Sequence, residues 1–223
     1  MCAYMLARAF WIEPNLVEVV HVEVGVPGLD PGLDGVRIAH ASDFHVRTDV
    51  DKARQVVAAI QSESPDLVCL TGDFVEETAG VRLLAPFLME MAKGRPAFAV
   101  LGNHDHQPAV DVEALISTFE RSGVHVLRND RAVVTVRGAK IDVVGVDDPY
   151  SGLDDLDAAF DRPDRPPSGS ERRFVLLLSH SPDIALKERA RQADLILCGH
   201  THGGQVRLPV FGPVRTGTKL GRR

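Results

Sequence analysis

The chain has 223 residues, of which 44% are hydrophobic and 25% charged, a balance typical of a globular protein able to bury its own core. A formal net charge of −6 lacks the basic footprint of nucleic-acid binding. The three cysteines are too few and too scattered for a disulfide framework, and Cys69 and Cys198 lie in apolar runs, where we expect buried thiols. No run approaches the roughly 18 apolar residues of a membrane span.

Residues 1–12 form a short apolar arm that is interrupted by Arg8 and lacks the cleavage pattern of a signal peptide. The arm is compatible with a buried N-terminal segment, a peripheral membrane contact or the remnant of a longer anchor. We therefore expect a cytoplasmic or membrane-peripheral protein. The sequence indicates no oligomeric state.

The first half of the chain alternates strand patterns with helix patterns. The strand patterns lie at 16–24, 36–41, 66–70 and 97–101. The helix patterns lie at 51–63, 79–93 and 111–121. This alternation predicts an α/β architecture with buried strands.

In the second half, three strand patterns follow one another without an intervening helix and predict an antiparallel meander. They lie at 124–127, 132–136 and 141–146. The later patterns are a helix at 153–160, an exposed Pro- and charge-rich loop at 161–173, a strand at 174–178, a helix at 182–191 capped by Ser181, and a strand at 195–198. We expect a single domain over 1–223, built as a four-layer α/β/β/α sandwich of two mixed sheets flanked by helices. Residues 208–223 have little apolar periodicity, so we expect either an irregular tail or a truncated chain in which one sheet lacks C-terminal strands.

Five of the apolar runs end in the same kind of polar loop. The loops are Ser42-Asp43-Phe44-His45, Thr71-Gly72-Asp73, Gly102-Asn103-His104-Asp105, Ser179-His180 and Gly199-His200-Thr201-His202. Ligands of open α/β sheets bind outside the carboxyl ends of the strands, so these side chains should meet at one edge. Imidazole, carboxylate and amide groups are ligands of borderline divalent metals.

A single His or Asp after a strand is more often a turn or cap residue, and only the repetition over five loops favours a metal site. The remaining histidines are given other roles. We expect His21 to be exposed, His40 to lie in the core or behind the ligands, and His125 to be structural. His106 follows His104 closely enough to face the cleft.

The ordered motifs DFH, GD, GNHD, SH and GHTH resemble those of the calcineurin-like metallophosphoesterases, and are similar to the bacterial stand-alone phosphodiesterase-like branch. The resemblance implies two divalent metal ions, for which Mn, Fe, Zn and Ni all suit the ligands. It implies a first metal on Asp43, His45 and His202, a second on Asn103, His180 and His200, and Asp73 as the bridge between them. It also implies that His104 contacts the phosphate and protonates the leaving group, and that Asp105 orients His104.

Two metals can clamp an in-line displacement at phosphorus and activate a water as the nucleophile. The sequence therefore predicts a binuclear-metal-dependent phosphoester hydrolase, foremost a phosphodiesterase acting on a small phosphoester substrate. Two alternatives stay open. One is a pyrophosphatase acting on a nucleotide-linked lipid precursor, and the other is a non-catalytic metal-binding scaffold.

Overall fold

The structure is a computed structural model that describes residues 16–161, 173–204, 207–208, 212–213 and 217–220. The N-terminal arm of residues 1–12 and nearly all of the predicted loop at 161–173 lie outside these ranges. Within them, no helix combines the length and the apolar composition needed to cross a membrane.

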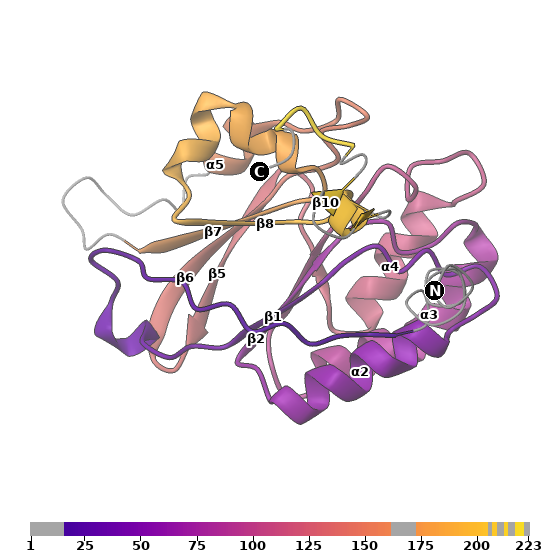
Figure 1. Cartoon of the computed structure of the whole chain (residues 1–223), viewed down its shortest axis with the longest axis horizontal. Helices are drawn as coiled ribbons and strands as arrows, with labels where there is room; N and C mark the ends of the chain where they lie inside the picture. Colours follow the sequence, from indigo (N-terminus) through magenta and orange to yellow (C-terminus); the bar gives the residue numbers. More distant parts are fainter. Residues whose placement is uncertain (1–15, 162–172, 205–206, 209–211, 214–216, 221–223) are drawn as a thin grey trace.

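The first sheet has four parallel strands in the order β1-β2-β3-β4. These are β1 (Ile38–Ala41), β2 (Leu67–Thr71), β3 (Ala97–Val100) and β4 (His125–Val126). Three helices cover its outer face, namely α2 (Asp51–Glu63), α3 (Thr78–Ala92) and α4 (Val112–Arg121) (Figure 1). Leu70, Leu84 and Phe119 are fully buried between sheet and helices, which fixes the strands against the outer layer.

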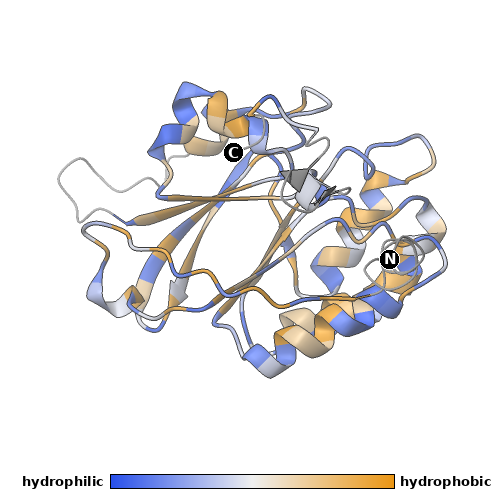
Figure 2. Ribbon diagram, viewed as in Figure 1, coloured by the Kyte–Doolittle hydropathy of each residue, from blue (hydrophilic) through white to orange (hydrophobic). Residues whose placement is uncertain are grey.

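The second sheet has the order β5-β6-β7-β8, with an antiparallel pair followed by parallel strands. Its strands are β5 (Asp130–Val136), β6 (Ala139–Gly145), β7 (Phe174–Ser179) and β8 (Leu195–Cys198). The short helix α5 (Leu156–Phe160) packs on its outer face, where Leu156 and Leu177 belong to one buried cluster. A separate apolar cluster, which includes Phe98 and Val143, lies between the two sheets. Figure 2 shows much hydrophobic colouring along the strands of the two sheets. The two sheets with helices on their outer faces confirm the predicted four-layer α/β/β/α arrangement.

The predicted meander is wrong at its first strand. β4 pairs with β3 in the first sheet, and Leu127 extends that pairing by donating to the Ala99 carbonyl at 2.8 Å. The chain then turns at Asn129, which has a φ of 54°, and enters the second sheet as β5. Local alternation predicted the strands correctly but could not choose between the sheets.

The predicted helix at 182–191 is two 3₁₀ helices, η4 (Pro182–Leu186) and η5 (Glu188–Gln192). Lys187 between them has extended backbone angles and donates to the Ile184 carbonyl, so an α-helical ladder cannot continue. The hydroxyl of Ser181 accepts a hydrogen bond from the Asp183 amide, as a cap does.

The predicted irregular tail contains regular pairing among its described residues. β9 (Arg207–Leu208) and β10 (Gly212–Pro213) form an antiparallel pair. Further along, the Lys219 amide donates to Asp183 at 2.8 Å, which ties the tail to η4. Two short 3₁₀ turns complete the described elements, η3 (Pro31–Leu33) and η6 (His202–Gly204).

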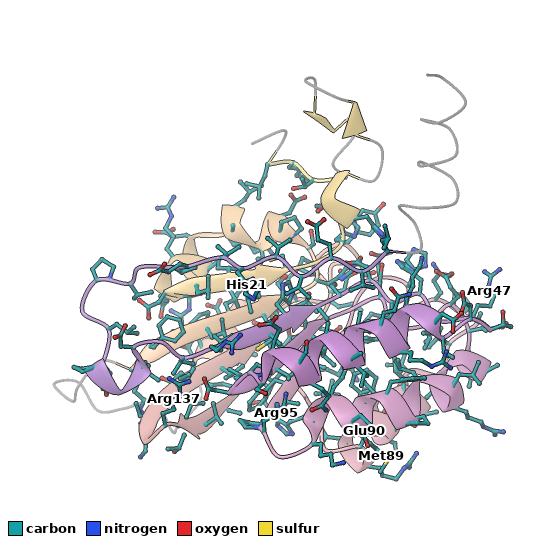
Figure 3. The ribbon with its side chains drawn as sticks, turned by 60° about the horizontal axis from the view of Figure 1, so that its bottom comes forward. His21, Arg47, Met89, Glu90, Arg95 and Arg137 are labelled. Carbon is teal, nitrogen blue, oxygen red and sulfur yellow. The ribbon has the colours of Figure 1, made fainter. Side chains whose placement is uncertain are left out.

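The strand predicted at 16–24 does not form. The segment instead runs beside α2, where the Val17 amide donates to Gln55 at 3.4 Å and His21 lies 3.0 Å from Glu63 (Figure 3). A groove of about 440 Å³ separates residues 17–22 from β1. Alternating valines suit any extended chain, and a strand also needs a partner within hydrogen-bonding distance.

Candidate metal centre

The carboxyl ends of β1, β2, β3, β7 and β8 bring the predicted ligands together in two overlapping groups. Ligand atoms of Asp43, His45, Asp73 and His202 all lie within 4.8 Å of one another. Asp73, His180 and His200 form a second group by the same measure. Asp73 belongs to both groups, the position that a bridging carboxylate requires.

In the first group the ring nitrogens and carboxylate oxygens converge on one point. His45 Nε2 lies 3.6 Å from Asp73 Oδ2 and 3.3 Å from His202 Nε2. His202 Nε2 is in turn 3.4 Å from Asp43 Oδ1. Imidazole lone pairs and carboxylates directed at a common point suit a cation, so these residues fit a divalent metal.

The second group surrounds His180, which is fully buried. Its Nε2 lies 3.2 Å from Asp73 Oδ2 and 3.2 Å from His200 Nδ1, which is 3.0 Å from the amide oxygen of Asn103. His180 Nδ1 donates to the Thr71 carbonyl at 2.7 Å, which leaves Nε2 as the ligand atom. Burial opposes a positive charge on this ring, but Asp73 raises the pKa of His180 to about 9. A cation would take the place of that proton.

Strained backbone accompanies these groups. Of the eight described non-glycine residues with a positive φ, five are predicted ligands. They are Asp43 (57°), His45 (46°), Asp73 (55°), His200 (69°) and His202 (48°). Residues other than glycine rarely adopt positive φ angles, and such residues cluster at functional sites.

Close backbone approach also shapes the centre. A Cβ atom at Gly102 would lie 2.3 Å from Asp73 Oδ1 and 2.5 Å from the Asp73 amide nitrogen. Only glycine therefore lets the loop after β3 reach the loop after β2. The same approach allows the His104 amide to donate to Asp73 Oδ1 at 2.8 Å.

The predicted role of Asp105 needs correction, because its carboxylate does not orient the His104 ring. Asp105 is fully buried and accepts hydrogen bonds from backbone amides. The donors are Asp73 (2.9 Å), Phe74 (2.8 Å), Val75 (3.3 Å) and Gly102 (2.9 Å). The turn that follows His104 directs this short side chain back under the loops, so Asp105 supports the loop that carries Asp73.

Glu76 takes the place that was predicted for Asp105. Glu76 Oε1 lies 2.6 Å from His45 Nδ1 and 3.1 Å from His104 Nδ1. Partial burial opposes its ionisation, yet contacts with the two histidines hold the pKa of Glu76 below its usual value. Glu76 was not among the predicted site residues. The signal that could have found it is an acidic residue three positions beyond Asp73.

The two ring nitrogens of His104 differ, because Nδ1 contacts neighbouring side chains and Nε2 does not take part in those contacts. Its Nδ1 contacts Glu76 and lies 3.0 Å from the Gln107 side-chain nitrogen, and its ring meets that of His45 edge-on at 4.6 Å. Nε2 is therefore the atom that can exchange a proton with a substrate. Because the side chain is partly exposed, His104 is accessible to one.

The other histidines lie outside the two ligand groups. His40 Nε2 is 2.7 Å from the Thr71 hydroxyl, behind the loop that carries Asp73. His106 is largely buried and lies 2.6 Å from Asp147, and His125 pairs with Glu120. His21 is exposed, as predicted.

A carboxylate shared by two groups of imidazole ligands, at the edge of a double sheet, is the arrangement of a metal-dependent phosphoesterase. Residues 36–204 match the family model described as calcineurin-like phosphoesterase. The chain therefore belongs to the calcineurin-like phosphoesterase family, as its motifs indicated.

Curated relatives agree with this assignment. The chain is 30% identical to the uncharacterized metallophosphoesterase YkuE of Bacillus subtilis, over 93% of this chain and 72% of that one. It is 34% identical to the phosphodiesterase YaeI of Escherichia coli, over 67% of this chain and 53% of that one. It is 25% identical to the UDP-2,3-diacylglucosamine pyrophosphatase LpxG of Chlamydia trachomatis, over 89% and 73%. The chain thus spans about half the length of YaeI and nearly three quarters of the other two.

Proposed function

We propose that the chain hydrolyses small phosphodiesters with a pair of divalent metal ions. Asp43, His45 and His202 would hold the first ion, Asn103, His180 and His200 the second, and Asp73 both. The observation that carries the proposal is the place of Asp73, whose Oδ2 faces His45 on one side and His180 on the other.

The donor set fits the chemistry of phosphoryl transfer. Bound divalent ions would supply positive charge and lower the pKa of an attacking water. Asp43 and Asp73 neutralise only part of that charge, so an anionic phosphate and its more negative transition state would be stabilised. An acidic chain could bind an anion in this way, because bound divalent ions would be the largest local charges.

A diester is preferred because YaeI, a relative at 34% identity, is named a phosphodiesterase. A second candidate substrate is a pyrophosphate within a nucleotide-linked lipid precursor, which the similarity to LpxG favours. A non-catalytic scaffold is less favoured, because His104 and Glu76 are assembled beside the two groups that share Asp73, where with His45 they form a third cluster of ligand-type atoms. A screen of Mn²⁺, Zn²⁺, Fe²⁺ and Ni²⁺ against diester, monoester and pyrophosphate substrates distinguishes the three.

Replacing His104 by Ala is expected to lower turnover by roughly 10²- to 10⁴-fold, the usual contribution of a general acid. Bound metal should change little, because Nδ1 of His104 contacts Glu76 and Gln107 and His104 belongs to neither of the two groups that share Asp73. Turnover of an alkyl diester and metal content by mass spectrometry are measured on the same sample. An equal loss of metal and activity would make His104 a ligand and overturn its role as the acid.

Replacing Glu76 by Ala is expected to lower turnover of an alkyl phosphodiester by about 10- to 100-fold, as the loss of a carboxylate behind a metal ligand commonly does. A diester with a 4-nitrophenyl leaving group needs little protonation and should suffer less. Glu76→Gln keeps an oxygen near the two rings and should recover part of the loss. Equal effects on both substrates would show that Glu76 acts on His45 and the metal alone.

A further inference from the structure

Tyr150 is an exposed aromatic residue beside the candidate metal centre. It lies in the loop that follows β6, and 67% of it is accessible to solvent. Its ring centroid is 5.0 Å from that of His200, at an interplanar angle of 42°. One part of the ring thus rests on a proposed ligand of the second metal, while the rest faces solvent.

The loop holds the Tyr150 backbone firmly. The Asp148 side chain is fully buried and accepts hydrogen bonds from the amides of Tyr150 (3.1 Å) and Ser151 (2.7 Å). The Leu153 amide donates to the Asp148 carbonyl at 3.0 Å, which closes the loop. Because a buried carboxylate fixes this turn, the exposed ring is presented from a rigid support.

The same loop is joined to the turn that carries His104. Asp147 is buried and lies 2.6 Å from His106 Nε2, and its other oxygen accepts from Arg128 Nε at 2.9 Å. His106 is two residues beyond His104. The position of the Tyr150 backbone is therefore fixed relative to both the second ligand group and the proposed acid His104.

We propose that Tyr150 is a specificity-determining residue whose ring stacks on a planar aromatic or heteroaromatic group attached to the phosphorus of the substrate. The inference rests on the proposed function, since it requires phosphorus at the second metal. Aromatic rings favour offset or edge-on pairs with centroids 4.5–7 Å apart, and a bound planar group would cover ring surface that now faces water. A flexible alkyl group offers no such pairing.

Binding of three phosphonates to the Mn²⁺-loaded protein by calorimetry tests this inference without turnover. Phenylphosphonate and cyclohexylphosphonate have rings of the same carbon number, one planar and one puckered, and methylphosphonate has none. The wild type should bind the phenyl compound about 2- to 10-fold more tightly than the cyclohexyl compound. Tyr150→Ala should remove that difference and leave methylphosphonate affinity unchanged, while Tyr150→Phe should retain it.

Leu153→Ala is the matched control, because Leu153 is an exposed apolar residue of the same loop. It should leave all three affinities unchanged. An equal loss of phenyl and cyclohexyl binding in Tyr150→Ala would reduce the ring to a general apolar surface and overturn the proposal. No difference between phenyl and cyclohexyl binding in the wild type would also overturn it. A wild type that binds none of the three, methylphosphonate included, would instead refute the metal centre and this inference with it.

Discussion

Replacing Asp73 by Asn should lower metal-dependent hydrolysis of a phosphodiester by at least about 10²- to 10³-fold, the loss seen when one transition-state-stabilising group is removed. The amide keeps the size of the side chain and can still accept from the His104 amide. It loses the negative charge that faces both His45 and His180. The affinity for both metals should fall, whereas replacing a residue that binds one metal would weaken the binding of that metal alone.

The fold of this variant should persist, because Asn fills the same space and the Asp73 amide keeps its bond to Asp105. Circular dichroism and a urea titration check this directly. Asp66→Asn is the matched control, since Asp66 is a partly exposed carboxylate that binds Arg37 and Arg137 elsewhere in the fold. Near wild-type turnover in Asp73→Asn would show that Asp73 does not bridge two metals.

Replacing Asp105 by Ala should cost at least about 3 kcal/mol of unfolding free energy, because each buried N–H left without an acceptor costs about 1–3 kcal/mol. Four backbone amides would lose their acceptor, three in the loop after β2 and that of Gly102 in the loop after β3. Urea unfolding of the protein measures the loss. Asp105→Asn keeps one acceptor oxygen and should lose less.

Asp111→Ala provides the comparison for this stability prediction. Asp111 is an exposed N-cap that accepts from the Ala114 amide at 3.0 Å, and removing such a cap costs about 1 kcal/mol. If Asp105→Ala destabilised the protein no more than Asp111→Ala, the four amides would not depend on Asp105. The carboxylate would then need another role.

Much of the site could be predicted from the sequence, because its residues directly follow the ends of strands. Apolar runs such as Leu67–Thr71 indicate buried parallel strands. The polar residues that follow such strands lie together at the carboxyl edge of the sheet. Each proposed ligand could therefore be identified from its place after a strand, without knowledge of any distant contact. The helix at 51–63 was predicted with its correct bounds for a similar reason, since its apolar spacing is regular.

The roles of Glu76 and Asp105 could not be predicted, because they depend on where a side chain points after the loop has folded. Asp105 sits directly after His104 in sequence, yet the turn sends the two side chains to different partners. Glu76 reaches His45 because Val46 and Val75 form an isolated parallel bridge between distant loops. Periodicity carries no information about such a bridge.

The sequence pattern also could not predict which strands pair with one another. The pattern at 124–127 is a strand in either sheet, and only the turn at Asn129 decides that β4 joins β3. The segment 16–24 pairs with no described strand, and a groove lies between it and β1. At 124–127 the strand was predicted correctly but its sheet was not, and at 16–24 the predicted strand does not form. In both cases the long-range contact that determines the outcome was not in the pattern.

The most direct test is a crystal structure of the Mn²⁺-soaked protein with an anomalous difference map. We expect two peaks about 3.5–4 Å apart, as in other two-metal phosphoryl-transfer sites. The Asp73 carboxylate should contact both, with His45 beside one peak and His180 beside the other. A single peak, or two peaks that do not share Asp73, would contradict the binuclear centre.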